Sequence, residues 1–157
     1  MKTLIVYYSW SGHTRRVAER LHKEKGWDMA EIRTVRLYPD SYQAVVAEGK
    51  RQQEEHILPA LEPLSKDLHQ YDTIVLGTPV WWYTMAPAVR AFLKENHLAG
   101  KSLCPFATHE GDPGRTMKDI KNEAAGAAVH YGMTILFSGS RLMEEEEDIR
   151  RWADEIK

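Results

Sequence analysis

Residues 4–14 read Leu4-Ile5-Val6-Tyr7-Tyr8-Ser9-Trp10-Ser11-Gly12-His13-Thr14, and this stretch decides how the rest of the chain is interpreted. The apolar run predicts a buried strand, and the polar turn after it predicts the start of a helix. The first amides of a helix have no acceptor within the helix, and the helix dipole makes that end positive. A phosphate group placed there is therefore hydrogen-bonded and electrostatically favoured without any Lys or Arg.

Four residues of this turn suit such a phosphate site. Ser9, Ser11 and Thr14 add hydroxyl donors, and Gly12 lets the backbone close round a ligand. The same residues also have an ordinary explanation, because Ser and Thr are the usual N-cap residues of any helix. The turn alone leaves both interpretations open.

Length and charge limit the class of protein. The chain has 157 residues, of which 43% are hydrophobic, and this predicts a single domain over residues 1–157 with a well-buried core. It carries 21 Lys and Arg against 23 Asp and Glu, so its net charge is −2. No stretch is strongly basic, and we therefore expect no nucleic-acid partner.

Cysteine and histidine usage and the apolar runs give three further expectations. Cys104 is the single cysteine, which excludes an internal disulfide and predicts a reducing, cytoplasmic location, with the thiol itself acting as a buried small hydrophobe. The seven histidines are scattered without a metal-ligand spacing, so no metal site is expected. No apolar run approaches the length of a membrane span, so no membrane partner is expected.

Five short apolar runs alternate with helical patterns, which predicts an α/β fold with a parallel sheet and helices on both faces. The expected strands are residues 3–8, 29–35, 73–76, 102–108 and 133–137. Apolar residues at helical spacing predict helices around residues 14–21, 85–93, 120–128 and 149–156, and residues 40–41 are expected to cap a polar helix through about Glu55. A strand order of 2-1-3-4-5 places a crevice between the first and third strands, where open α/β sheets bind ligands.

Two more loops are expected at the same edge of the sheet. The loop at 77–87 contains Thr78, Pro79, Val80, Trp81, Trp82 and Tyr83. Its three aromatic rings offer flat faces to a planar heterocycle, unless one or two of them pack into the core. The loop after the fourth strand contains Thr108, His109, Glu110 and Gly111, whose backbone amides can bind ring heteroatoms, although turn chemistry alone also explains its composition. Together the three loops predict a site for a phosphorylated planar cofactor.

With these motifs the chain resembles the flavodoxin-like superfamily of FMN-binding proteins. The resemblance rests on residues 9–14, on Thr78-Pro79-Val80-Trp81-Trp82-Tyr83 with Pro87-Ala88 and Phe92-Leu93 after it, and on the strand order. It implies a flavodoxin-like three-layer sandwich and non-covalently bound FMN. The implied phosphate site is Ser9, Ser11, Gly12, His13 and Thr14. The implied ring site is Pro79, Val80, Trp81, Trp82 and Tyr83, with residues 108–111 along the other edge of the ring.

The second motif also resembles the flavin loop of NAD(P)H:quinone reductases, and this likeness makes Trp82 and Tyr83 the expected flavin contacts. The chain departs from the family pattern at His13, where Asn or a small residue is more usual, and in the acidic loop 109–112. A receiver-type phosphotransfer domain shares the strand order but needs carboxylates at the end of the first strand, where this chain has Tyr7-Tyr8-Ser9.

Three functions remain open at this point. The first is an electron carrier that works with a redox partner protein, which the short length supports. The second is a reductase that uses NAD(P)H and a quinone-type or flavin acceptor, which the near-neutral charge supports because carriers of this family tend to be strongly acidic. The third is a flavin-binding scaffold without turnover. FMN chemistry needs orientation more than acid or base groups, so no side chain is named as catalytic. The sequence predicts no oligomeric state.

Overall fold

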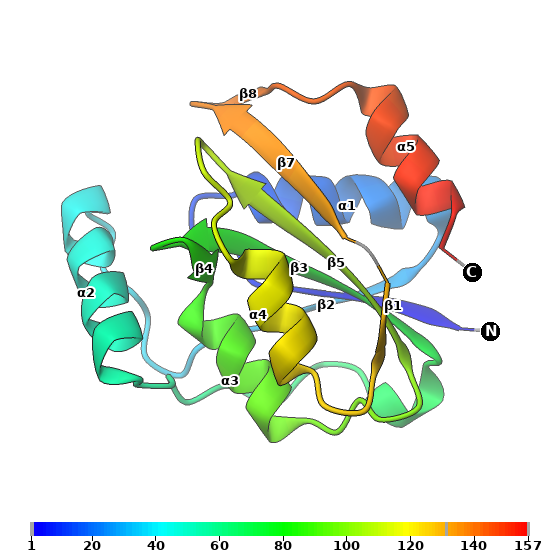
Figure 1. Ribbon diagram of the computed structural model, residues 1–157, viewed down its shortest axis with the longest axis horizontal. Coiled ribbons are helices and arrows are strands. Elements are labelled where there is room, and N and C mark those ends of the chain that lie inside the picture. The colour runs from blue at the N-terminus through cyan, green and yellow to red at the C-terminus, as the bar shows by residue number, and fades with distance from the viewer. Residues whose placement is uncertain (1, 131, 157) are drawn as a thin grey trace.

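The computed structural model describes residues 2–130 and 132–156, which are organised around one twisted sheet (Figure 1). Five strands run parallel: β1 (Thr3–Tyr7), β2 (Asp28–Glu31), β3 (Thr73–Trp81), β5 (Ser102–His109) and β7 (Met133–Ser138). Their spatial order is β2-β1-β3-β5-β7, which confirms the predicted order 2-1-3-4-5. Three short strands extend the sheet: β4 (Thr84–Met85), β6 (Ala128–Val129) and β8 (Arg141–Leu142).

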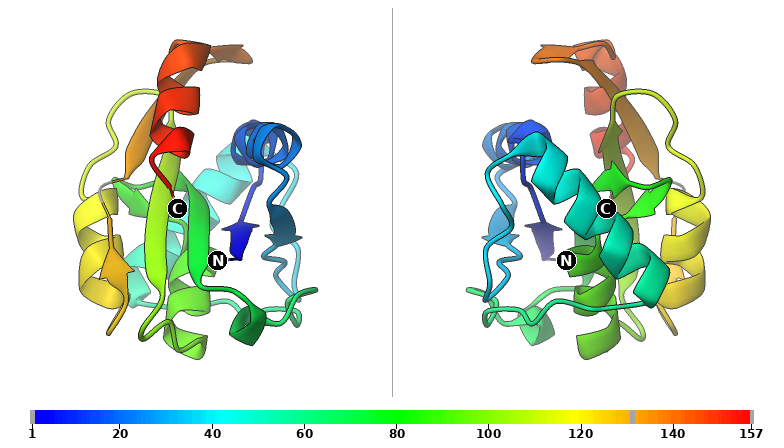
Figure 2. Two further views of the ribbon diagram at one scale, coloured as in Figure 1. Left: turned by 90° about the vertical axis from the view of Figure 1, so that its right-hand side faces the viewer. Right: turned by 90° about the vertical axis from the view of Figure 1, so that its left-hand side faces the viewer.

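Helices cover both faces of the sheet, so the protein is a three-layer α/β sandwich, as expected (Figure 2). One face packs against α1 (His13–Lys25) and α5 (Glu146–Asp154), and the other packs against α3 (Pro87–Glu95) and α4 (Thr116–Glu123). Ile5 and Tyr7 of β1 belong to the first core, whereas Leu4 and Val6 belong to the second. Because β1 is buried on both faces, its residues 4–7 are all apolar or aromatic and do not alternate with polar ones.

Helix α2 (Tyr42–Glu55) lies beside the carboxyl ends of the strands, apart from the two helical layers (Figure 1). Its N-cap is Ser41, whose hydroxyl accepts a hydrogen bond from the Ala44 amide at 3.3 Å. The predicted cap at residues 40–41 and the predicted end at Glu55 are both confirmed. A short 3-10 helix, η1 (Leu68–Gln70), precedes β3. In the part of the chain described, none of the helices combines the length and the apolar character that crossing a membrane requires.

The main correction to the predicted fold concerns β3, which continues to Trp81 instead of ending at residue 76. Gly77 and Pro79 suggest a turn in the sequence, yet both lie within the strand. Gly77 is needed there because the Phe106 ring fills the space of a side chain: a Cβ on Gly77 would lie 2.3 Å from Phe106 Cζ. The end of β3 then pairs with β4 in a tight hairpin over residues 80–85. The predicted loop 77–87 is therefore wrong for most of its length.

Other boundaries move for local reasons. β2 ends at Glu31, and after the Ile32 amide has donated to the Tyr7 carbonyl the chain turns away from β1 and forms an antiparallel bridge between Thr34 and Leu61. α4 ends at Glu123, and residues 128–129 form β6 instead of the last turn of the expected 120–128 helix. In the same way Met85 lies in β4, before α3, and Ile156 lies beyond α5. Small and apolar side chains in these segments fit a strand edge as well as a helix face.

Candidate functional site

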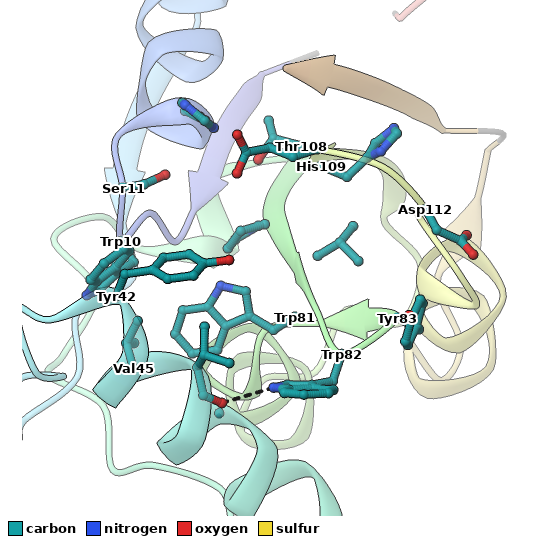
Figure 3. Close-up of a pocket in the computed structure, with 16 residues that line it drawn as sticks. Trp10, Ser11, Tyr42, Val45, Trp81, Trp82, Tyr83, Thr108, His109 and Asp112 are labelled. Carbon is teal, nitrogen blue, oxygen red and sulfur yellow. Dashed lines mark hydrogen bonds between the residues drawn. The ribbon is translucent and has the colours of Figure 1, made fainter. Parts of the chain in front are cut away.

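A pocket of about 430 Å³ opens at the carboxyl edge of the sheet, within the size range of small-ligand sites (Figure 3). Four segments form its walls: the β1–α1 loop, the first half of α2, the β3–β4 hairpin and the loop after β5. Its lining residues are Trp10, Ser11, His13, Tyr42, Val45, Val46, Gly49, Pro79, Val80, Trp81, Trp82, Tyr83, Thr108, His109, Glu110 and Asp112. The three predicted segments therefore meet, the second of them as a hairpin and not as a loop, and α2 adds a fourth wall.

The β1–α1 loop carries the donors expected of an anion site. Ser9 Oγ accepts hydrogen bonds from the amides of Gly12 and Arg15, each at 3.2 Å, which shapes the loop. Gly12 is the N-cap of α1 with a φ of 105°, a backbone conformation that favours glycine. None of the described residues accepts a hydrogen bond from the amides of Ser11, His13 and Thr14. These donors lie at the positive end of a helix and are available to an anion.

Thr14 is placed differently from the other loop hydroxyls. Its side chain is buried, and its Oγ1 lies 2.8 Å from Oγ1 of Thr108, which is also buried. The pair ties α1 to the end of β5. One hydroxyl hydrogen is used between the two side chains, which leaves the other for a second acceptor.

We expect Thr14→Val and Thr108→Val each to lower the free energy of unfolding by about 1–2 kcal/mol, because each leaves one buried hydroxyl unpaired. The double variant should cost less than the sum of the two, with a coupling of about 1 kcal/mol. Urea denaturation of the four proteins without added flavin measures this cycle. If the losses of unfolding free energy in the two single variants simply add up in the double variant, the hydrogen bond between the two hydroxyls contributes nothing to stability.

His13 is held by packing. Its ring stacks on Phe137 with 4.2 Å between centroids and 4° between planes, and the Arg16 guanidinium lies 5.7 Å from the same Phe137 ring. The side chain still lines the pocket. His13 therefore forms part of the pocket wall at the start of α1, with its ring orientation fixed by Phe137.

The three consecutive aromatic residues have two different environments. Trp81 packs edge-to-face against Tyr8 and Tyr38, with centroid distances of 5.8 and 5.1 Å. Burial raises the pKa of Tyr38 to about 12 and the pKa of Tyr8 further, so both phenols are protonated at neutral pH. Trp82 and Tyr83 are 41% and 56% exposed and form the turn of the hairpin. One ring thus supports the wall, and two remain available to a ligand or partner.

The turn residues have an unusual backbone. Trp82 has a φ of 55° and Tyr83 a φ of 67°. A two-residue hairpin turn with both φ values positive normally selects Asn-Gly, and bulky residues there are strained. Three contacts hold the strained turn. Trp82 Nε1 donates to the Val46 carbonyl at 3.0 Å (Figure 3), the Arg115 amide donates to the Tyr83 carbonyl at 2.7 Å, and Gly114 packs directly against Tyr83. Such strain is typical of ligand-binding segments.

The loop after β5 is ordered by its own polar groups. Glu110 Oε1 accepts from the Gly139 amide at 3.1 Å, and Asp112 Oδ1 accepts from the Gly114 amide at 2.8 Å. His109 Nδ1 is buried and has no hydrogen-bond partner among the described residues. A buried polar atom without a partner at a pocket wall indicates that a ligand or a water completes the site.

Most of the predicted site residues line the pocket, and five do not. Those outside the lining are Ser9, Gly12, Thr14, Thr78 and Gly111. Ser9 and Gly12 shape the β1–α1 loop through its backbone, and Thr14 ties the start of α1 to β5. The Thr78 hydroxyl is fully buried and accepts from the Ala86 amide at 3.1 Å, so it fixes the hairpin from inside the fold.

The predictions missed Trp10, Tyr42, Val45, Val46, Gly49 and Asp112. Trp10 lies within the phosphate-loop motif and Asp112 within the third loop, so their places in the sequence could have indicated them. The α2 residues could not be found in this way. Gly49 matters because a Cβ there would lie 3.1 Å from the Trp81 ring, so its small size allows α2 to pack against the hairpin.

Cys104 is buried in β5, and burial raises the pKa of its thiol to about 11. The prediction that Cys104 is a buried small hydrophobe is confirmed.

A doubly wound parallel sheet with an anion-suited first loop and an aromatic pocket at its carboxyl edge defines a nucleotide-binding type of α/β protein. The flavodoxin family model matches residues 2–156. The chain therefore belongs to the flavodoxin family.

Relatives of known name are similar over most of the chain. An NAD(P)H dehydrogenase (quinone) of Cupriavidus metallidurans is 28% identical over 145 residues, which cover 86% of this chain and 69% of that protein. NAD(P)H dehydrogenase (quinone) 3 of Rhizobium meliloti is 28% identical over 159 residues, which cover 92% and 72%. A crystal structure of a flavoprotein from Lactobacillus acidophilus NCFM in complex with FMN has a TM-score of 0.78 at 23% identity and covers 97% of this chain and 98% of that one. This last likeness shows a shared fold.

Proposed function

We propose that residues 1–157 form one domain that binds FMN non-covalently and uses it for electron or hydride transfer. The observation that carries the proposal is the group of amides at Ser11, His13 and Thr14 beside the same pocket as the aromatic turn. A phosphate and a planar ring joined by a short linker require these two features together. Family membership and the FMN bound to the Lactobacillus acidophilus protein support the choice of FMN.

The donor set fits the phosphate of FMN. Besides the three amides, Ser11 offers an exposed hydroxyl, and Ser9 uses its oxygen as an acceptor from two amides, which leaves its hydroxyl hydrogen for a ligand. The helix dipole of α1 adds favourable charge for a dianion. Arg15 forms an ion pair with Glu31, so the backbone and the hydroxyl groups supply the site.

The remaining walls fit the flavin ring. Pro79, Val80, Trp81, Trp82 and Tyr83 would lie along one side of it, and residues 108–111 along its other edge. The unpartnered Nδ1 of His109 is a candidate donor or acceptor for a ring heteroatom. When bound, FMN supplies one- and two-electron chemistry, and the protein binds the ring, orients it and limits its exposure to water. No side chain is needed as an acid or base for that role.

Two activities follow from the same site. The names of the two relatives favour an NAD(P)H-dependent reductase of quinone-type acceptors. The apolar wall of Tyr42, Val45 and Val46 is also suited to a planar apolar acceptor. The second candidate is an electron carrier for a protein partner, which the exposed Trp82 and Tyr83 would contact. The single, buried cysteine supports a reducing compartment, and we place the protein in the cytoplasm.

The test is anaerobic reduction of the FMN-loaded protein by NADH or NADPH, followed by a neutral quinone. For a reductase we expect the flavin absorbance near its long-wavelength maximum to bleach faster than about 1 per second and to return when quinone is added. Reduction by dithionite is the control, because it shows that the bound flavin can be reduced. Bleaching by dithionite but not by either nucleotide would favour the carrier, and failure to bind FMN would refute both candidates.

A further inference from the structure

The hairpin that carries Trp82 and Tyr83 lies between two cavities. One is the pocket described above, and the other, of about 510 Å³, lies between α2, α3 and α4. Trp82 lines both of them. Side-chain packing therefore supports the turn incompletely, although its two positive φ values call for firm support.

Gln53 supplies that support from α2. Its side-chain Nε2 donates to the Trp81 carbonyl at 3.2 Å and to the Met85 carbonyl at 2.9 Å. These two carbonyls flank the turn on its two strands. A single amide group therefore connects the two strands of the hairpin to a helix 28 and 32 residues away in sequence.

Arg90 of α3 fixes Gln53 in turn. Arg90 Nη1 donates to Gln53 Oε1 at 2.8 Å, and Arg90 Nε donates to Glu123 of α4 at 2.9 Å. Thr84 of the hairpin donates its hydroxyl hydrogen to Asp119 at 2.5 Å, and Asp119 lies 3.8 Å from Arg90. The side chains of Arg90, Asp119 and Glu123 are only 18–22% exposed, so solvent screens these contacts less than it screens surface ion pairs.

We propose that Gln53 and Arg90 are positioning residues, which hold the turn formed by Trp82 and Tyr83 in its strained conformation and so set the wall against which the flavin ring lies. We call the hydrogen bonds from Gln53 to the Trp81 and Met85 carbonyls, together with the one from Arg90 to Gln53, the bridge. The bridge acts through the hairpin backbone, and neither side chain needs to touch the ligand. The role of the turn as a wall for the flavin ring rests on the proposed function, whereas the bridge itself can be tested in the protein without flavin.

The test is hydrogen exchange by NMR in the full chain without added flavin. Two protons report on the turn: the Arg115 amide, which donates to the Tyr83 carbonyl, and the Trp82 indole N–H, which donates to the Val46 carbonyl. The Ile32 amide, which donates to the Tyr7 carbonyl at 2.6 Å, reports on the sheet. Local opening of the turn exposes the first two protons to solvent exchange, while the Ile32 amide in the sheet stays protected.

Two variants separate the bridge from general stability. Gln53→Leu removes both ends of the bridge, and Gln53→Glu keeps an acceptor for Arg90 but places oxygen against the Trp81 and Met85 carbonyls. For both we expect exchange of the two turn protons to rise about tenfold or more, since two neutral hydrogen bonds are lost, with little change at Ile32. Gln43→Leu, at an exposed position of the same helix, is the matched control and should leave all three protons unchanged.

The outcomes are distinct. If Gln53→Leu fails to fold, the exchange rates of Gln53→Glu alone test the proposal. Unchanged exchange at the turn in Gln53→Glu would overturn the proposal, as would an equal rise at Ile32. Once the exchange result is known, the FMN dissociation constant tests the link to function: a rise of about tenfold is expected from an opened hairpin. Faster exchange with unchanged FMN affinity would support the bridge as the support of the turn, but it would refute the role of the turn as a wall for the flavin ring.

Discussion

Ser11→Asp is expected to weaken FMN binding at least about 100-fold, because it places a carboxylate among the amides that are assigned to the phosphate dianion. Like charges within a few ångströms at a partly buried site repel by several kcal/mol, and about 2.7 kcal/mol is enough for this effect. Ser11 is exposed and lies just before α1, where an acidic residue is favourable for the helix. Folding should therefore be retained, and a fluorescence titration with FMN measures the loss.

Riboflavin is the control ligand, since it has the same ring without the phosphate. Its affinity should change less than about threefold in the same variant, because the introduced charge has no phosphate to repel. Ser11→Ala should fall between the wild type and Ser11→Asp. Equal losses for FMN and riboflavin would show that the substitution distorts the ring site and would remove the phosphate from the β1–α1 loop.

The largest effect on stability is expected for Gly114→Ala. A Cβ on Gly114 would lie 2.3 Å from the Tyr83 carbonyl oxygen and 2.5 Å from Tyr83 Cβ, and Gly114 has a φ of 57°. Backbone atoms cannot yield as a flexible side chain does, so the 110–115 loop must move away from the hairpin. We expect a loss of about 3 kcal/mol in the free energy of unfolding. FMN affinity should fall about 30-fold or more, because the hydrogen bond from Arg115 to Tyr83 is broken in the same step.

Gly111→Ala is the matched control in the same loop. A Cβ there would have no atom within 4 Å, and its φ does not lie in the positive region. It should change the free energy of unfolding by less than about 0.5 kcal/mol. Urea denaturation of both variants makes the comparison, and FMN titration of Gly114→Ala follows it. Similar losses of stability in the two variants would mean that the contact between Gly114 and Tyr83 is not what holds the loop against the hairpin.

The features that the sequence predicted correctly are those encoded locally. An apolar strand followed by a turn of Ser, Gly and Thr is encoded within residues 4–14, and the strand order follows from the alternation of strands and helices. The three segments expected at one edge of the sheet do meet there, although the second is a hairpin and not a loop. The same local logic identified the cap of α2 at Ser41 and the buried character of Cys104.

What the sequence did not reveal depends on contacts between distant residues. Gly77 is required within its strand because Phe106 packs over it, and the strained turn of Trp82 and Tyr83 is contacted by Val46, Gly114 and Arg115, all from distant segments. No local pattern encodes these partners. The wall from α2 was missed for the same reason, since a polar crossover helix has no periodicity that would point its Val45 and Val46 toward a ligand.

An amide NMR titration of the protein with FMN and, separately, with riboflavin tests whether the phosphate lies at the start of α1 and the ring against the hairpin. The amides of Ser11, His13 and Thr14 should shift strongly with FMN and little with riboflavin, while both ligands should shift the indole signals of the hairpin. We expect this separation because the proposed phosphate and ring positions lie at different walls of one pocket. FMN binding that leaves these three amides unshifted, or riboflavin shifting them as much as FMN does, would contradict it.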